Sequence, residues 1–348
     1  MMRRAATVAW LLVLVSLPMW LSSPYFLHIL IITGIFTVAA MSLNLLLGYS
    51  GQLSLGHVAF FGIGAYTSAL MSLGFGLDLT DSWKLVVDPK PVAVSFATAI
   101  AVTALAGWLI GKLSFKVRGA YFVIVTVSFA EVVRLVALNW VELTQGPMAL
   151  NNIPPVSVWL PGIGEYRFLG KVPNYYLMLA VAAVSYLVVA RLVRSRAGRA
   201  MIALRENEAL ATSVGVDVTR YLVLATVVSA AMAGAAGALY AHYIRIVDPD
   251  IFLFIYTVTM VIMVVTGGKG TLAGPIVGGI IFGIAPQILR ELAGPEVQWI
   301  VYGILMILIV CFLPQGIVPA LRNAGQRRRD TRSAGGGTAT PATRDGGG

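Results

Sequence analysis

One carboxylate and one guanidinium stand three residues apart inside an apolar stretch. Glu131 and Arg134 have the i, i+3 spacing that places two side chains on one face of a helix, so their charges can neutralise each other. Ionisable groups within a membrane span are costly and are often kept for function. Three interpretations therefore stay open: a structural ion pair, a role in a transport path, and proton coupling.

Catalytic and metal-binding patterns are not recognisable in the sequence. The histidines His28, His57 and His242 are widely separated, and no Gly-x-Ser-x-Gly elbow or Cys/His metal spacing occurs. We expect His57 to be a packed or interfacial residue. The sequence thus predicts no enzyme, no metal and no cofactor, although distant residues could still assemble an intramembrane active site.

A glycine-rich stretch, residues 264–275, superficially resembles a phosphate-binding loop. Lys269 is followed by Gly270 rather than by Ser or Thr, and Met263 stands where the motif requires its first glycine. We interpret the stretch as a sharp turn between two helices that pack closely through small residues. The glycines assigned to this turn and packing are Gly267, Gly268, Gly274 and Gly278.

The stretch from Leu46 to His57 has almost no charge, yet its glycines and small polar residues interrupt two strongly apolar segments. Freed backbone groups survive at membrane depth only against protein or a water-lined cavity. The stretch is therefore a candidate lining of a permeation path, or else a tight helical hairpin. Candidate path residues, taken from this stretch, from Asn44 just before it and from the apolar segment around Glu131, are Asn44, Gln52, Ser54, Thr126, Ser128 and Glu131.

The loop from Arg191 to Arg220 is too polar to span a membrane. Residues 203–215 are rich in good helix formers and end on Gly215, which suits a C-terminal cap. They predict a short helix with Ala203, Leu210 and Val214 on one face. Such a helix could dock into another protein's groove or could be a solvated connector.

The overall composition is that of an integral membrane protein and not of a water-soluble one. Hydrophobic residues make up 58% of the 348 residues and charged residues 11%, far below the roughly 25% of soluble domains. A helix needs about 20 apolar residues to cross. Ten candidate spans follow: 5–22, 26–48, 58–76, 91–111, 119–138, 175–190, 221–243, 251–267, 273–289 and 298–314. We predict an all-α, polytopic integral membrane helical bundle of about 10 transmembrane helices.

The basic residues indicate the orientation of the bundle. With a cytoplasmic N-terminus, most Lys and Arg fall in the loops on that side, in agreement with the positive-inside rule. Both termini are then cytoplasmic. The net charge of +10 reflects topology and does not indicate nucleic-acid binding.

The two ends of the chain differ from the rest. Residues 5–22 could be a first span or a cleaved signal peptide. We divide the chain into a transmembrane permease domain, 1–322, and a disordered basic and Gly-rich cytoplasmic tail, 323–348. The start of the tail could contact anionic lipid headgroups or could be solvated.

Several motifs, in fixed order over residues 36–318, resemble a known family. They are Asn44-Leu45-Leu46-Leu47-Gly48-Tyr49-Ser50-Gly51-Gln52-Leu53-Ser54-Leu55-Gly56-His57, Arg118-Gly119-Ala120-Tyr121-Phe122 with Thr126 and Glu131, Leu143-Thr144-Gln145-Gly146-Pro147-Met148, Arg205-Glu206-Asn207-Glu208-Ala209 with Val214-Gly215-Val216-Asp217, Gly234-Ala235-Ala236-Gly237-Ala238-Leu239-Tyr240, and Gly267-Gly268-Lys269-Gly270-Thr271. The chain is similar to LivM-type permeases of the branched-chain amino acid ABC importers, a family that also includes importers of urea, amides and organic acids.

The resemblance implies a multi-pass protein of the bacterial inner membrane that forms a translocation path for branched-chain or related amino acids. The implied partners are a second, LivH-like permease, two cytoplasmic ABC ATPases that bind the nucleotide, and an extracytoplasmic substrate-binding protein. The stretch from Arg205 to Gly215 would then be the coupling loop. Residues assigned to coupling are Arg205, Glu206, Glu208, Ala209 and Gly215.

Alternative functions remain at this stage. An ion-gradient-driven secondary transporter would use Glu131 as its proton or cation site. An ABC permease for urea, amides or small organic acids would fit the same motifs, since the sequence does not identify the solute.

Overall fold

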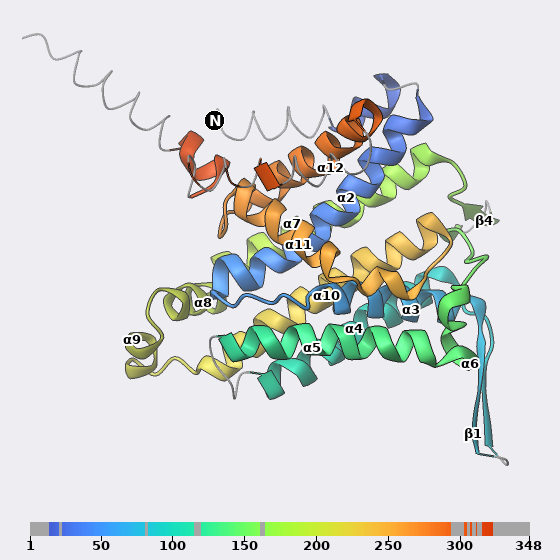
Figure 1. The fold of residues 1–348 in the computed structure, drawn as a ribbon, viewed down its shortest axis with the longest axis horizontal. Helices are drawn as coiled ribbons and strands as arrows, with labels where there is room; N and C mark the ends of the chain where they lie inside the picture. Colours follow the sequence, from blue (N-terminus) through green and yellow to red (C-terminus); the bar gives the residue numbers. More distant parts are fainter. Residues whose placement is uncertain are drawn as a thin grey trace, which may run out of the picture.

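The computed structural model describes residues 14–20, 23–80, 83–114, 120–160, 164–293, 303–304, 307, 311 and 315–322 (Figure 1). Its helices are α2 (Pro24–Asn44), α3 (Val58–Leu73), α4 (Val92–Ser114), α5 (Ala120–Asn139), α6 (Val141–Thr144), α7 (Lys171–Arg194), α8 (Arg196–Glu206), α9 (Glu208–Ser213), α10 (Val218–Ile244), α11 (Phe254–Gly267) and α12 (Gly274–Ala293). A π-helical turn η1 (Leu45–Ser50) and 3-10 turns η2 (Gly146–Met148) and η3 (Pro249–Phe252) complete the helical elements. The predicted tail, 323–348, and most of the predicted spans 5–22 and 298–314 lie outside the described residues.

Two antiparallel hairpins join helices at one end of the bundle. Strands β1 (Phe75–Thr80) and β2 (Trp83–Val87) pair with Phe75 opposite Val87, and β3 (Ser157–Leu160) pairs with β4 (Gly164–Arg167). The sequence predicted an all-α bundle with no strands here. Each hairpin has only two strands, so it is a peripheral connection between helices and does not form a separate layer of the fold.

Five of the described helices are long and apolar enough to cross a membrane. They are Pro24–Ser50, Val92–Ser114, Tyr121–Asn139, Lys171–Arg194 and Val218–Ile244. In the most apolar window of α2 and of α10, 78% of the residues are buried, against 22% for α4, α5 and α7. The bundle is therefore built around α2 and α10, with the other three at its periphery (Figure 1).

Helices α3 and α11 are shorter than the predicted spans 58–76 and 251–267. They have 16 and 14 residues, fewer than the about 20 that a full crossing needs. Each follows a segment that is not α-helical: residues 51–57 precede α3, and the 3-10 turn η3 precedes α11, with buried Phe252 stacked on Tyr66 of α3. The predicted span 58–76 agrees with α3 at its first residue and the predicted span 251–267 agrees with α11 at its last, and each helix is three residues shorter than its span.

Small residues on α10 allow α3 and α4 to approach closely. At the α3 crossing, a Cβ on Gly237 would collide with the backbone carbonyl of Phe61, and a Cβ on Gly64 would collide with the backbone of Gly234. At the α4 crossing, Gly107 faces Ala230. Contact between helix backbones replaces large side chains here, as is common between membrane helices.

We expect Gly237→Val to destabilise the bundle by at least about 1–3 kcal/mol, the usual cost of overpacking, because a backbone carbonyl cannot move aside as a side chain can. Thermal unfolding of the detergent-purified protein measures this. The control is Gly76→Val in β1, where an added Cβ meets nothing within 4 Å. Equal midpoints for the two variants would contradict the close-packing interpretation.

Candidate functional site

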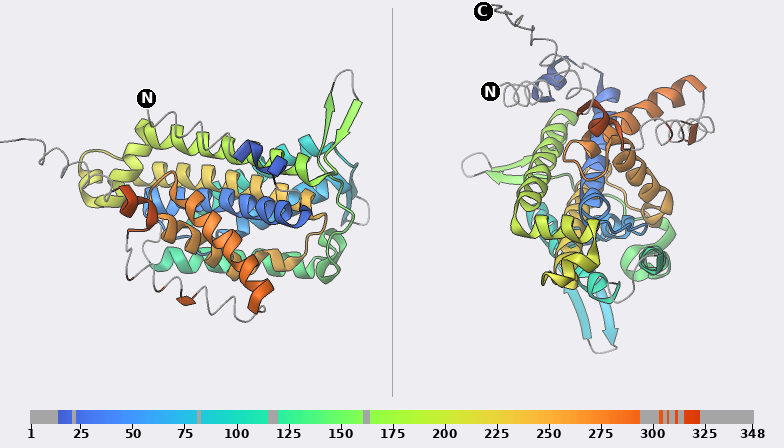
Figure 2. Two further views of the ribbon diagram at one scale, coloured as in Figure 1. Left: turned by 90° about the horizontal axis from the view of Figure 1, so that it is seen from above. Right: turned by 90° about the vertical axis from the view of Figure 1, so that its left-hand side faces the viewer.

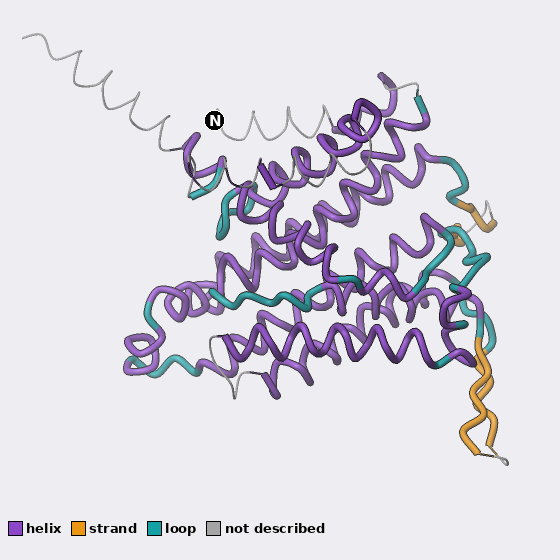
Figure 3. The backbone as a smooth tube through the Cα atoms, viewed as in Figure 1, coloured by secondary structure: helices purple, strands orange, loops and turns teal. Residues whose placement is uncertain are grey.

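The polar stretch after α2 begins as a π-helical turn and continues as irregular backbone. The π-turn η1 ends at Gly51, whose φ of 75° is left-handed and favours glycine, and residues 51–54 have no regular structure. Figure 3 shows this loop running between helices toward the start of α3. The tight helical hairpin considered from the sequence is therefore wrong, since residues 51–54 between η1 and α3 are irregular backbone.

Histidine 57 ends this stretch in the core. Its side chain is 0% exposed, and its Nε2 lies 2.7 Å from the hydroxyl of Ser42 on α2. The hydroxyl of Ser229 on α10 donates to the Ser42 backbone carbonyl. Three elements thus meet through short polar contacts, and His57 is a packed residue.

The position of Ser229 gives the depth of this contact. Ser229 lies 11 residues after Val218, the first residue of α10, or about 16 Å along the helix axis. Helix α3 therefore begins near the middle of the bundle, where Thr257 of α11 accepts a hydrogen bond from the Val58 N–H (3.2 Å). A start at this depth explains why α3 can be short.

Asn44, the last residue of α2, holds the turn between α11 and α12. Its Oδ1 accepts from the Gly270 N–H, and its Nδ2 donates to the Thr271 carbonyl, both at 2.9 Å. The side chain is 2% exposed. One amide thus satisfies a backbone donor and a backbone acceptor of a segment more than 220 residues away.

Arg205 reaches the same place from the polar loop. Its Nη1 donates to the Gly48 carbonyl in η1, and its Nε and Nη2 donate to Glu206. A Cβ on Gly51 would lie 2.9 Å from the Arg205 side chain, so glycine leaves room for it. Asn44, Gly48, Arg205, Gly270 and Thr271 form what we call the junction.

The junction joins three segments that the sequence analysis singled out separately: residues 46–57, the loop 191–220 and the turn 264–275. Arg205 was predicted to contact an ATPase, but its guanidinium lies against η1 within this chain. Local sequence gives no signal for this contact, because Arg205 and Gly48 are 157 residues apart.

The helix predicted over residues 203–215 is two helices. Asn207 ends α8 and caps α9, its Oδ1 accepting from the Leu210 N–H at 2.9 Å. The prediction of one continuous face was wrong because the Asn207 side chain competes for backbone N–H groups. Leu210 and Val214 are nevertheless exposed, at 64% and 75%, while Glu206 and Ala209 are also exposed and Glu208 begins α9.

Beyond α9 the chain turns at Gly215, whose φ is 86°. Such a left-handed conformation is costly for residues with a Cβ and is not available to proline. The protruding end of α8 and α9, at the left of Figure 1, is thus shaped by Asn207 and Gly215.

The glycines of the turn from α11 to α12 lie where backbones touch. A Cβ on Gly267 would meet the Gly274 carbonyl, and a Cβ on Gly278 would meet the Met263 carbonyl. Gly268 has a φ of 120° and lies beside Pro319. The two helices pack closely along this edge.

The candidate path residues occupy two environments. Asn44, Ser54 and Thr126 are buried within the chain, and Gln52 is half-buried. Ser128 and Glu131 lie on the open face of α5. The structure therefore does not bring the six residues into one lining.

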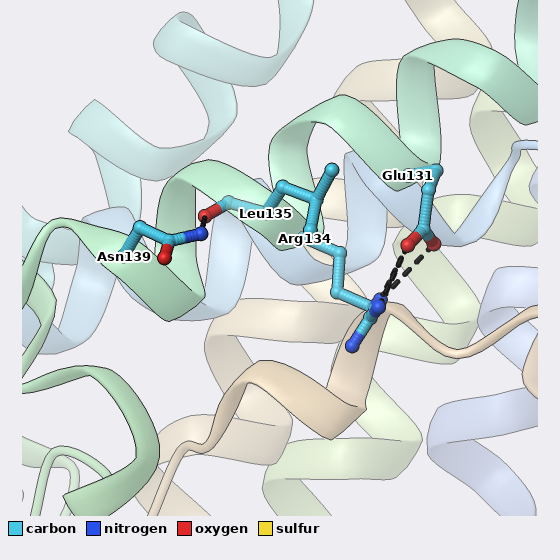
Figure 4. Close-up of polar contacts among 4 residues, drawn as sticks. All are labelled: Glu131, Arg134, Leu135 and Asn139. Carbon is cyan, nitrogen blue, oxygen red and sulfur yellow. Dashed lines mark hydrogen bonds and ion pairs between the residues drawn. The ribbon is translucent and has the colours of Figure 1, made fainter.

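Glu131 and Arg134 form the ion pair that their spacing predicts. The Arg134 Nη2 lies 2.7 Å from Glu131 Oε1, and Nε donates to both carboxylate oxygens (Figure 4). The Glu131 side chain is 52% exposed and that of Arg134 23%. Figure 2 shows α5 at the edge of the bundle.

A surface pocket at the end of the bundle that bears the hairpins was not predicted. It is lined by His28, Pro155, Phe168, Leu169, Lys171, Asn174, His242, Tyr243, Ile244 and Arg245. Its polar groups already bond within the protein: His28 to Tyr243 (2.7 Å), His242 to Ser68 (2.8 Å), and Lys171 to the Pro24 carbonyl (2.9 Å). We assign these lining residues a structural role, because their hydrogen bonds hold the ends of α2, α7 and α10 together.

The described residues hold no group of three or more His, Cys, Asp or Glu that could bind a metal ion.

Residues 25–310 match the family described as the permease component of branched-chain amino acid transport systems. The chain is 33% identical to the high-affinity branched-chain amino acid permease protein LivM of Salmonella typhimurium, over 83% of this chain and 69% of that protein. LivM of Escherichia coli is likewise 33% identical, over 84% and 69%. LivH of Salmonella typhimurium, a permease protein of the same kind of system, is 27% identical over 81% and 91%.

No solved structure matches the chain. The family match covers all three segments of the junction and the whole of α5, and the resemblance to LivM predicted from the sequence motifs is confirmed. This chain is a multi-pass membrane protein and belongs to the family of permease components of branched-chain amino acid transport systems.

Proposed function

We propose that this chain is the LivM-like permease subunit of an ABC importer that carries branched-chain amino acids across the bacterial inner membrane. Ten spans cross the membrane, both termini are cytoplasmic, and residues 323–348 are a cytoplasmic tail. A LivH-like permease encloses the other side of the path. Two cytoplasmic ATPases supply the energy, and an extracytoplasmic binding protein delivers the solute.

The observation that carries this proposal is the contact of Arg205 with η1. The polar loop containing α8 and α9 presents exposed Leu210 and Val214 outward, while Arg205 at the end of α8 holds the end of α2. A segment that meets a partner on one side and a span on the other can transmit a rigid-body movement. This arrangement supports coupling to ATPases and gives no similar reason for an ion-driven transporter.

The path is proposed to run along the open face of α5, where Ser128 and Glu131 lie. Asn44, Gln52, Ser54 and Thr126 are proposed to act behind it, supporting the irregular backbone of residues 46–57. The turn from α11 to α12 is kept close to the junction by four glycines: Gly267, Gly268, Gly274 and Gly278.

Co-purification with uptake tests the proposed function. We expect the tagged chain to bring down a second permease and two ATPases, and reconstituted vesicles to import L-leucine only with ATP and binding protein. Uptake that follows a proton gradient and ignores ATP would instead establish the secondary transporter. Import of urea but not leucine would retain the ABC permease and change its solute.

Gly215→Pro and Glu208→Lys should each uncouple ATP hydrolysis from transport. Solute uptake should fall at least about tenfold in each variant. Proline is excluded at a φ of 86°, and lysine at the start of α9 opposes the helix dipole. Gly215→Ala is the control, because an added Cβ there meets nothing within 4 Å and only the backbone strain remains. Normal uptake by both test variants would remove α9 from the coupling path.

A further inference from the structure

The ion pair on α5 stands out because of where it lies along the helix. Glu131 is near the midpoint of Ala120–Asn139, and Arg134 is one turn further. The backbone carbonyl of Thr126, about 8 Å before Glu131 along the axis, touches Gly56 in the irregular segment at mid-bundle. The pair is therefore at the depth of the hydrocarbon and not at either interface.

The open faces of the other peripheral helices have a different character. Helices α4, α5 and α7 are equally open, with 22% of their apolar windows buried. The exposed large side chains of α4 include Val102, Leu105 and Leu109, and those of α7 include Val184 and Leu187. Such faces suit lipid.

Helix α5 instead exposes a carboxylate and a guanidinium at mid-depth. A charged pair facing lipid tails is expensive, so ionisable groups inside spans face protein or water-filled cavities. With the LivH-like permease on its other side, α5 faces an aqueous path between the two subunits. This step rests on the proposed function.

The pair also has the chemistry of a receptor. Each charge satisfies the other while the path is empty, so the site carries no net charge at rest. A zwitterionic amino acid is also neutral overall and carries one group complementary to each side chain. When the solute binds, the ion pair between Glu131 and Arg134 is replaced by ion pairs between these side chains and the solute. Because the charges are paired both before and after binding, the solute is held only weakly, as transport requires.

The surroundings of the pair extend the match. Ile124, Val132 and Leu135 on the same helix are 60%, 57% and 43% exposed, and they offer aliphatic surface beside the charges. Asp250 in η3 is close enough to interact electrostatically with Arg134, so the guanidinium keeps a counter-charge when it leaves Glu131.

We propose that Glu131 and Arg134 are the site in the translocation path that receives the charged groups of a zwitterionic amino acid. The Glu131 carboxylate accepts hydrogen bonds from the ammonium group, and the Arg134 guanidinium donates to the carboxylate. The aliphatic surface of α5 contacts the branched side chain.

The test uses the complete importer in proteoliposomes, with uptake of radiolabelled L-leucine normalised to the assembled complex. Glu131→Gln and Arg134→Gln should each lower ATP-driven uptake about 10- to 100-fold, the range expected for a lost hydrogen bond to a charged group. ATP hydrolysis stimulated by leucine-loaded binding protein should continue, because the surfaces that dock the partners are unchanged.

Two double variants separate a receptor from a structural pair. The swap Glu131→Arg with Arg134→Glu keeps an i, i+3 ion pair but reverses the receptor, so uptake should stay low. Replacing both residues by leucine removes both charges from the membrane and therefore favours insertion, yet uptake should again be low. Lys112→Gln is the control, since Lys112 lies over the Trp108 ring near the end of α4, 4.4 Å from its centroid.

Each outcome decides the proposal. Uptake above half the wild-type rate in the swap or in the double-leucine variant would show that the pair is structural or dispensable. A wild-type importer without ATP-driven leucine uptake would instead overturn the proposed branched-chain amino acid solute, and this receptor with it. The receptor is supported only when wild-type and Lys112→Gln complexes import leucine and all four pair variants do not.

Discussion

An importer carrying Arg205→Ala should still hydrolyse ATP but import its solute at least about tenfold more slowly. The Arg205 guanidinium donates to the Gly48 carbonyl, and this is a contact between the loop bearing α8 and α9 and the end of α2. A hydrogen bond from a charged donor contributes more than a neutral one. Without it, movement of α8 is not passed to η1. Uptake and ATP hydrolysis measured on the same proteoliposomes report the loss of coupling.

The matched control is Arg199→Ala on the same helix. Arg199 is exposed, and its Nη1 donates only to the nearby Arg194 carbonyl (3.1 Å), so its loss should leave uptake close to wild type. Arg205→Lys should be intermediate, because a lysine keeps the charge but cannot bond Gly48 and Glu206 with a planar fork. Wild-type uptake by Arg205→Ala would exclude the junction from coupling.

Asn44→Ala should destabilise the protein by about 1–3 kcal/mol, because it leaves two part-buried backbone groups without their partner. The Gly270 N–H and the Thr271 carbonyl both bond the Asn44 amide, and no methyl group can replace it. The turn between α11 and α12 would then detach from the end of α2. The expected readout is a lower thermal midpoint of the purified complex together with lost uptake.

Asn44→Asp refines this prediction. The carboxylate can still accept from the Gly270 N–H but cannot donate to the Thr271 carbonyl, so the variant should remain well below wild type. Asn151→Ala is the control, because that exposed side chain bonds only the carbonyls of Met148 and Ala149, both at 3.0 Å. A wild-type midpoint for Asn44→Ala would mean that the turn is held by its glycine packing alone.

The long spans were predictable because the cost of leaving an apolar helix in water depends on a local window of sequence. The predicted spans 91–111 and 221–243 correspond to α4 (Val92–Ser114) and α10 (Val218–Ile244). The i, i+3 pairing of Glu131 with Arg134 was predictable for the same reason, since helix geometry fixes it. The short helices α3 and α11 were also located, but a run of apolar residues did not reveal that each is three residues shorter than its predicted span.

The ordered motifs determined the family, and helical periodicity determined which side chains can meet within one span. Only the tertiary structure decided that Arg205 turns inward to Gly48, that Asn44 holds the turn at Gly270, and that Ser42 meets His57 and Ser229. These contacts join residues up to 226 positions apart, and their geometry is set by how close glycine and alanine let the helices approach. The local sequence around each residue does not determine which distant residues it will contact, whereas the packing of the helices in the bundle does.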